Sequence, residues 1–276
     1  MINIHVRTPN EALTTITEKM FGYGKQSSPR GQDTLEICNA TILIEEPWQI
    51  PLTIKNRNLR NFIGAIEALQ LVGQTSKPEQ LIDNVKTFER FADNGIFHGA
   101  YGVRIFGMLQ PVIDLLKRDP DSRQAILTIY NSQADLNVQA KDIPCTLTIQ
   151  FMIRDNTLCA RTSMRSNDIW LGLPYDLIQF IALQGAIAKA LSISMGWYCH
   201  TVGSLHLYES NLDDAKRIRL SEPAIKKPYQ PLWSGNTIEE ISRQARQILD
   251  NKNSLTDPEA TAFEHWLNNA IHEKDN

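Results

Sequence analysis

The sequence predicts an α+β fold in which helices pack against one large mixed β-sheet. Residues 144–166 alternate apolar and polar side chains on both sides of Asp155-Asn156, which predicts a hairpin with one buried face. Residues 173–194 are apolar nearly all round, which predicts a central helix packed on the sheet. The other strand and helix patterns follow in mixed order. The alternating apolar positions of the hairpin are Leu147, Ile149, Phe151 and Ile153.

The elements before the hairpin are predicted from local signals. Pro9 and Glu11 near the start of residues 8–22 indicate a helix, and the β-branched residues of 34–47 indicate a strand. Helical spacing returns at 58–73 and 78–95, and each of these segments ends at a glycine. After a loop at 96–107, a helix at 108–122 is stopped by Asp-Pro, and residues 123–131 are typical of a strand.

The elements after the central helix are a final strand and a set of outer helices. Residues 196–210 indicate the strand, and three segments, 212–221, 238–250 and 258–276, indicate peripheral helices. The Pro-rich segment 221–233 resembles a linker. We therefore expect one catalytic domain over residues 1–276, with a C-terminal helical extension from about 222 to 276.

Composition restricts the class of protein. The 276 residues are 42% hydrophobic, which is enough for a substantial core. The net charge of −3 gives no bulk signal for nucleic acid or an anionic membrane. We find no leader-like segment at the N-terminus and no apolar run of about 18 residues, so we expect a soluble, cytoplasmic protein. The four cysteines form no CxxC pair, which argues against a zinc site and fits a reducing compartment.

Cys145 is the candidate nucleophile. It follows Pro144 at the start of a strand, where a sheet exposes side chains, although an isolated cysteine is more often a small buried hydrophobe. Arg30, Arg123 and Arg165 could lower its pKa and bind an anion, because guanidinium groups are the preferred receptors for phosphate. Taken singly, each arginine is equally compatible with an ordinary surface position.

Two further sites contain polar groups in apolar surroundings. Glu67 lies inside an apolar helix, where a carboxylate must be paired or do chemistry. His206 and Tyr208 alternate on a strand, so their side chains share one face, which could be core or site. None of these residues decides the function alone.

Together these motifs resemble the thymidylate synthase family, and more narrowly its pyrimidine-nucleotide hydroxymethylase branch. The order "PRG", "IEAL", "AYG", "DPDSR", "PC", "RSNDIWLGLPYD" and "HTVGSLHLYES" matches the family from about residue 10 to about residue 220. The segment "RSNDIWLGLPYD" and the His-x-Tyr pair are the most specific parts. The resemblance implies a thymidylate synthase-like fold that dimerises through its sheet.

The resemblance also implies the chemistry. Cys145 would attack C6 of a pyrimidine 5′-monophosphate, which makes C5 nucleophilic toward the one-carbon unit of 5,10-methylenetetrahydrofolate, used as a co-substrate without a metal. Glu67 would be the general acid/base that moves protons through ordered water. Asp168 matches the aspartate that bonds the pterin of the folate, and Tyr101 matches an active-site tyrosine.

The remaining carried-over positions concern the nucleotide. Arg30, Arg165 and Ser166 match phosphate-binding positions, and His206 and Tyr208 match the pair that holds the sugar 3′-hydroxyl. Arg123 matches the arginine that reaches the phosphate of the neighbouring subunit, which implies an obligate homodimer.

Several positions depart from thymidylate synthases. Thr146 follows the nucleophile where those enzymes usually have histidine, Gln124 replaces a second arginine, and Ser204 stands where many relatives have an acid. "PRGQDT" replaces an "RTGTGT" start, and "NNAIHEKDN" lacks the apolar tail that closes over folate. These departures favour a divergent specificity.

Asp176 is the position that predicts the base. Thymidylate synthases have asparagine here, whose amide donates to uracil O4 and accepts from N3–H. Cytosine inverts this edge, so a carboxylate accepts from its amino group and shares a proton with N3. Mispaired buried polar groups can reject a substrate by about 10⁴-fold. The alternative is that Asp176 merely complements the dipole at a helix N-terminus.

The sequence therefore predicts a homodimeric hydroxymethyltransferase of a cytidine-type monophosphate, with dCMP first and CMP close behind. Water, instead of hydride from the folate, would complete the reaction. The alternatives are C5 methylation of dUMP or dCMP, and a catalytically idle relative that binds nucleotides or RNA. The joint presence of Cys145, Glu67 and three arginines argues against an idle site.

Overall fold

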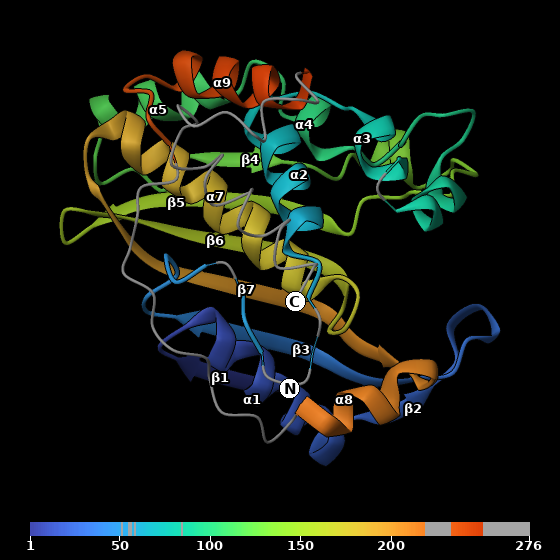
Figure 1. Ribbon diagram of the computed structural model, residues 1–276. Coiled ribbons are helices and arrows are strands. Elements are labelled where there is room, and N and C mark those ends of the chain that lie inside the picture. Colours follow the sequence, from blue (N-terminus) through green and yellow to red (C-terminus); the bar gives the residue numbers. More distant parts are fainter. Residues whose placement is uncertain (51, 55–56, 58, 84, 219–232, 251–276) are drawn as a thin grey trace.

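A computed structural model describes residues 1–50, 52–54, 57, 59–83, 85–218 and 233–250. Within these residues one mixed seven-stranded sheet has the order β1-β3-β7-β6-β5-β4, with β2 added on β3 (Figure 1). β1 runs parallel to β3 and β6 parallel to β7, while the other neighbours are antiparallel. The strands are β1 Ile2–Val6, β2 Lys25–Ser27, β3 Thr34–Ile44, β4 Ile126–Thr128, β5 Thr146–Arg154, β6 Thr157–Asp168 and β7 Ser194–Tyr208.

Helices cover one face of this sheet (Figure 1). The longest, α7, crosses the middle strands, and α2 lies beside it. Outside them, α5 and α9 lie at one end of the sheet and α1 and α8 at the other. The helices are α1 Pro9–Tyr23, α2 Asn61–Val72, α3 Pro78–Ile82, α4 Tyr101–Arg104, α5 Leu109–Arg118, α6 Ser132–Asp135, α7 Leu173–Leu191, α8 Leu212–Ile218 and α9 Ile238–Asp250, with 3₁₀ turns at Pro29–Gly31, Lys86–Phe91 and Glu209–Asn211.

The core lies between α7 and the sheet. Phe180 on α7, Phe151 on β5 and Tyr198 on β7 are almost completely buried. α2 approaches α7 so closely that a Cβ added to Gly64 would lie 2.9 Å from Cβ of Ile178. A glycine is therefore needed at this crossing, and the close approach determines how near the side chains on the facing turns can come.

A one-residue irregularity runs across three neighbouring strands. The pairing skips one residue on each strand, namely Asn39 on β3, Arg165 on β6 and Gly203 on β7. On β7 the buried positions change there from even-numbered residues such as Val202 to odd-numbered ones such as Leu205. Because side chains alternate along a strand, the extra residue turns those beyond it to the other face of the sheet.

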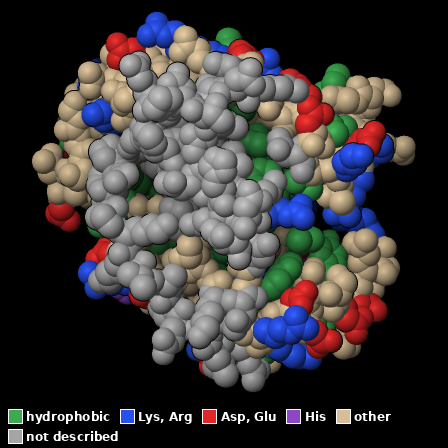
Figure 2. Space-filling view, viewed as in Figure 1, with side chains coloured by type: hydrophobic (Ala, Val, Ile, Leu, Met, Phe, Trp, Pro, Cys, Tyr) green, Lys and Arg blue, Asp and Glu red, His purple; other side chains and the backbone are tan. Residues whose placement is uncertain are grey.

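The other sheet face is not covered by any element of the described chain. It carries partly or fully exposed side chains, among them Thr41, Leu43, Arg161, Ser163 and Thr201. Ser163 and Thr201 bond one another across β6 and β7, at 3.0 Å between their hydroxyl oxygens. On the helix side, Lys and Arg alternate with Asp and Glu around the rim of the molecule (Figure 2).

The α+β class, the hairpin and the central helix are confirmed. Asp155 and Asn156 have φ values of 50° and 57°, as a two-residue type I′ turn requires. Leu147 is the exception in the hairpin, because a register shift between Thr146 and Thr148 buries Thr146.

Other segments differ from expectation. Residues 78–95 form α3 and a separate 3₁₀ turn, because Val85 is extended, with φ −143° and ψ 88°, and interrupts the helix. The expected loop 96–107 contains α4, and β1 and β2 were not predicted. Residues 219–232, which include most of the linker, and the expected helix 258–276 lie outside the described residues.

Candidate active site

The segment before β5 presents Cys145, and Arg165 on β6 holds this segment in place. The backbone N–H of Arg165 donates to the carbonyl of Cys145 at 2.8 Å. Its guanidinium donates to the carbonyls of Pro144 and Ile143, both at 2.9 Å. Three successive carbonyls are thus bound by one residue, so the backbone that carries the thiol is fixed.

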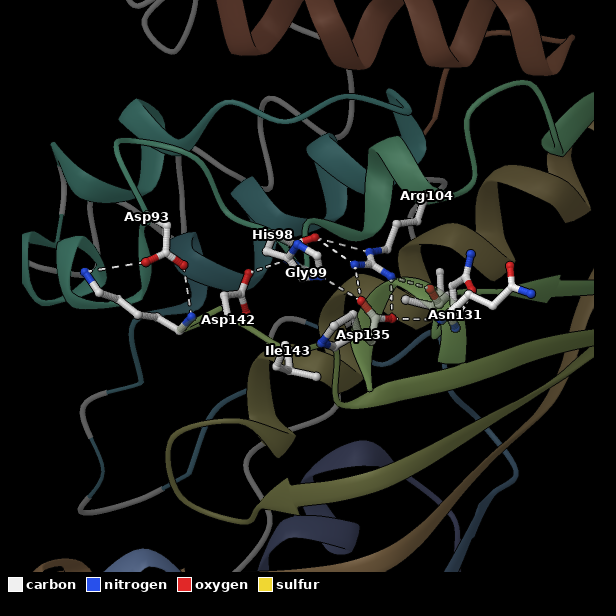
Figure 3. A network of polar contacts seen from close by, with 12 residues as sticks. Asp93, His98, Gly99, Arg104, Asn131, Asp135, Asp142 and Ile143 are labelled. Atoms are coloured by element: carbon white, nitrogen blue, oxygen red, sulfur yellow. Dashed lines mark hydrogen bonds and ion pairs between the residues drawn. The ribbon is translucent and has the colours of Figure 1, made fainter. Parts of the chain in front are cut away.

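A buried ion-pair network anchors the chain upstream of this segment (Figure 3). Asp135 accepts two hydrogen bonds from Arg104, each 2.8 Å, and its carboxylate contacts Nε2 of His98 at 2.7 Å. The same guanidinium donates to the carbonyls of His98 and Ile129. The bond from Arg104 holds the pKa of Asp135 well below its usual range. The loop before α4 and the chain after β4 are therefore tied together.

A second link joins the loop before α4 to the segment that carries the thiol (Figure 3). The backbone N–H of Gly99 donates to Oδ2 of Asp142 at 3.0 Å. A Cβ on Gly99 would lie 3.0 Å from the backbone carbonyl oxygen and both carboxylate oxygens of Asp142, so Gly99 allows a tight approach here. Burial raises the pKa of Asp142. Nearby, Lys141 lies 3.8 Å from the carboxylate of Asp93.

The thiol of Cys145 is partly buried and rests in its neutral form. Burial raises its pKa, Arg165 opposes that shift, and the negative charge of Asp176 adds to it. Arg30 also lowers the pKa but contributes less. Arg165 and Arg30 therefore lower the pKa as expected, but desolvation outweighs their positive charge and the net shift is upward.

Glu67, which is partly buried, and Asp176, which is buried, form a pair of carboxyl groups, and the charge of Asp176 reaches Cys145. Burial first, and then the charge of Asp176, raise the pKa of Glu67 well above its usual value. Burial also raises the pKa of Asp176 to about 7, against hydrogen bonds from Asn167 and Gln179. Asn167 donates to Oδ2 of Asp176 at 2.5 Å, and Gln179 donates to Oδ1 at 3.0 Å. Asp176 is therefore a buried acceptor with defined partners.

Tyr101 completes this group of residues. Its hydroxyl accepts from the backbone N–H of Thr146 at 3.4 Å, and its ring stacks on Phe180 with centroids 6.1 Å apart. Burial, followed by the charges of Asp176 and Cys145, raises its pKa well above 10. Cys145, Glu67 and Tyr101 therefore each lie within electrostatic reach of Asp176.

A polar row lies beyond the irregularity in β6 and β7. Oγ of Ser166 is 3.5 Å from Nδ1 of His206, whose ring meets Tyr208 edge to face at 5.2 Å. Asp168 pairs with His206 across the strands, and its Oδ1 accepts from the backbone N–H of Trp170 at 2.8 Å. Burial raises the pKa of Asp168, against this bond and the nearby His206. Asn167 connects this row to Asp176.

The two remaining arginines are placed differently. Arg30 is exposed in a 3₁₀ turn with φ 54°, and its charge reaches Cys145. Arg123 is also exposed, and its backbone carbonyl accepts a hydrogen bond from Gln150. The structure thus brings together all the predicted site residues except Arg123.

Several residues of the site were not predicted. Asn167, Gln179, Arg104, Asp135 and Asp142 all contact or support its members. The spacing of Gln179, three residues after Asp176 on one helix, was a usable signal because such positions share a helix face. We find no group of three or more His, Cys, Asp or Glu side chains that could hold a metal ion in the described chain, and no helix there has the length and apolarity to cross a membrane.

Comparison with known proteins identifies the family of the chain. The family model "Thymidylate synthase" matches residues 12–250. A protein named deoxyuridylate hydroxymethyltransferase from Bacillus phage SP01 is 31% identical over 224 residues, which cover 75% of this chain and 58% of that protein. A second protein of that name, from Pseudomonas phage M6, is 31% identical over 181 residues, covering 63% and 52%. The chain spans just over half the length of these relatives. It belongs to the thymidylate synthase family.

Proposed function

We propose that the protein is a one-carbon transferase that hydroxymethylates C5 of a cytidine-type nucleoside 5′-monophosphate, dCMP first and CMP close behind. The observation that carries the proposal is that the buried carboxyl group of Asp176 lies within electrostatic reach of both the Cys145 thiol and the carboxyl group of Glu67. This set supplies a nucleophile, a proton carrier and a reader of the base edge.

Cys145 is proposed to add to C6 of the pyrimidine. The raised pKa of the thiol means that a proton must leave as the C–S bond forms. Arg165 and Arg30 favour the thiolate, and the same two residues, with Ser166, are the proposed ligands of the 5′-phosphate. Addition at C6 breaks the conjugation of the ring and makes C5 nucleophilic. Glu67, whose pKa burial raises well above its usual value, is the proposed proton carrier.

Asp176 is the proposed reader of the base. With a pKa of about 7 it changes protonation readily near neutral pH. One oxygen can accept from the amino group of cytosine while a proton is shared with N3. Ionised Asp176 would meet O4 of uracil with lone pairs on both sides, which is unfavourable in a buried site.

The proposed co-substrate is 5,10-methylenetetrahydrofolate, which supplies the one-carbon unit. Asp168 is the proposed acceptor for N–H groups of the pterin. A carboxylate has about four lone-pair positions. The backbone N–H groups of Trp170 and Leu171 occupy part of them, so acceptor capacity remains and the residue fits this use. His206 and Tyr208 are the proposed ligands of the sugar.

We also propose a homodimer formed through the uncovered sheet face. The apolar face of a sheet is normally covered by another layer of structure, and the helices of the described chain cover only one face of this sheet. Arg123, whose side chain is exposed, would then reach the phosphate of the partner. Sedimentation of the whole protein, and of Arg123→Ala, would test both points. A monomer at micromolar concentration contradicts the proposal.

A second candidate substrate is dUMP, because both relatives are named for deoxyuridylate. One experiment separates the candidates. The protein is incubated with CMP, dCMP, UMP or dUMP and methylenetetrahydrofolate, and products are identified by mass. A gain of one hydroxymethyl group on a cytosine nucleotide supports the proposal, and absorbance from dihydrofolate would instead indicate methylation. No change in any nucleotide contradicts the proposal and favours an idle binding protein. Full activity of Cys145→Ser contradicts the proposed role of the thiol as the nucleophile.

The base assignment has its own variant. Asp176→Asn should shift preference toward uracil, by about 10² to 10⁴ in the ratio of kcat/KM values. Asp213→Asn, at an exposed aspartate on α8, is the control and should leave the ratio unchanged. An unchanged ratio in Asp176→Asn would leave only the helix-dipole explanation for this residue.

A further inference from the structure

The proposed mechanism assigns no role to Gln179. It lies on α7 and is 5% exposed. Its Nε2 donates to Oδ1 of Asp176 at 3.0 Å and contacts Oε2 of Glu67 at 3.5 Å. One amide nitrogen therefore faces both carboxyl groups, and an amide nitrogen has two N–H donors, one for each.

The packing of two helices creates this bridge. Helices α2 and α7 approach one another closely at Gly64 and Ile178. Gln179 directly follows Ile178 on α7, and Glu67 lies about one turn beyond Gly64 on α2. Because Gly64 has no Cβ, Glu67 on α2 comes within reach of a side chain on α7. Asp176 reaches the same amide because it precedes Gln179 by three residues on α7.

We propose that Gln179 is a positioning residue that holds Asp176 and Glu67 at a fixed separation by donating one N–H to each. The inference rests on the proposed function for its consequence in catalysis, but the bridge itself can be tested without substrate. An N–H donor stabilises a carboxylate more than a carboxylic acid, so the amide favours ionisation of both groups, although burial raises both pKa values and the charge of Asp176 raises that of Glu67 further.

The bridge connects base binding to proton transfer. When Asp176 shares a proton with the bound base, its negative charge is reduced, and Glu67 can then ionise more readily. The fixed amide keeps the two groups close enough for this effect to be felt. Other titratable groups face the pair from neighbouring elements and add to the background field: Tyr101, Asp142, Cys145, Asp168, Tyr175 and Tyr198.

The variant Gln179→Met tests the bridge because it keeps the length of the side chain and removes both N–H donors. The matched control is Gln184→Met, at another buried glutamine of α7. The amide of Gln184 donates only to backbone carbonyls, such as that of Leu158 at 2.7 Å. Gln179→Glu keeps the size and replaces the donor by an acceptor, so it serves if the methionine variant does not fold.

The first measurement is a pH titration of the ligand-free protein by NMR of ¹³C-labelled Asp and Glu carboxyl groups, with Asp176→Asn and Glu67→Gln to assign the signals. Both midpoints should rise by about one pH unit or more in Gln179→Met and stay in place in Gln184→Met. A shift of Asp176 alone would overturn the bridge, as would equal shifts in both glutamine variants, which would indicate general loosening of α7.

The second measurement uses the nucleotide that the wild-type protein converts. The kcat of Gln179→Met should fall at least about 10- to 100-fold, which is the loss expected for one hydrogen bond to a charged group, because the variant removes two such bonds. The acid limb of its pH profile should move to higher pH by the shift seen in the titration. If the wild-type protein converts no pyrimidine nucleotide, the proposed function fails. The titration then still decides whether Gln179 joins the two carboxyl groups.

Discussion

Replacing Asp176 by asparagine should stabilise the protein, and by an amount that depends on pH. Burial raises the pKa of this carboxyl from 3.8 to about 7, so the native state binds its proton more tightly than the unfolded chain does. Between these two pH values the native state carries more protons, and the free energy of unfolding therefore falls as pH rises. At about 1.4 kcal/mol per pH unit, the full cost of ionising the buried group is ~4 kcal/mol.

Asparagine removes this cost and can be accommodated. Its amide presents one acceptor and one donor, whereas Asp176 now accepts from two amides. Asn167 can resolve the conflict by turning its own amide, because its buried Oδ1 has no hydrogen-bond partner among the described residues. We therefore expect Asp176→Asn to be close to neutral in stability near pH 4 and more stable than the wild-type protein by up to ~4 kcal/mol at pH 8.

The assay is urea unfolding of both proteins between pH 5 and pH 8, followed by tryptophan fluorescence. The difference in unfolding free energy should grow by about 3 kcal/mol across this range. Asp213→Asn controls for the removal of a carboxylate as such, because Lys216 lowers the pKa of this exposed group and no growth with pH is expected. A difference between Asp176→Asn and wild type that stays constant from pH 5 to pH 8 would refute the reasoning.

Three further predictions follow from the packing and the charges. At pH 7 Cys145 should react with iodoacetamide more slowly than the exposed Cys38, and its rate should rise with pH because burial raises its pKa; mass spectrometry of the labelled peptides would show the order, and equal rates would contradict it. Asp135→Asn should cost about 3–5 kcal/mol in urea unfolding, since it leaves a largely buried guanidinium without its counter-charge, and a cost below about 1 kcal/mol would contradict the network. Gly64→Ala should cost about 1–3 kcal/mol by overpacking against Ile178, and unchanged stability would mean that the two helices can separate freely.

The sheet and its central helix could be predicted because their signals are local. Ile149 and Phe151 alternate with polar neighbours, and Asp155-Asn156 is a turn sequence, so the hairpin follows from short-range rules. The helix predicted at 78–95 failed because the extended backbone at Val85 has no marker in the apolar spacing.

The site was predicted only as far as single residues resemble a family pattern. The contact between Gln179 and Glu67 joins positions 112 residues apart, and no local rule connects them. Asp135 in the polar segment 131–136 has the sequence character of a surface residue, yet the folded chain buries it against Arg104. The upward net shift in the pKa of Cys145 was not predicted for a related reason, because desolvation depends on the atoms that surround the thiol in three dimensions.

The irregularity shared by Asn39, Arg165 and Gly203 restricts how the length of this chain can vary. A residue added or removed there would turn every later side chain of β7, including His206, to the wrong face. The hairpin tip at residues 155–156 lies beyond this row and can change length without altering the register of the strands that carry the site. Insertions and deletions among natural variants are therefore expected at the tip and excluded from the row, even where the residue types in the row differ.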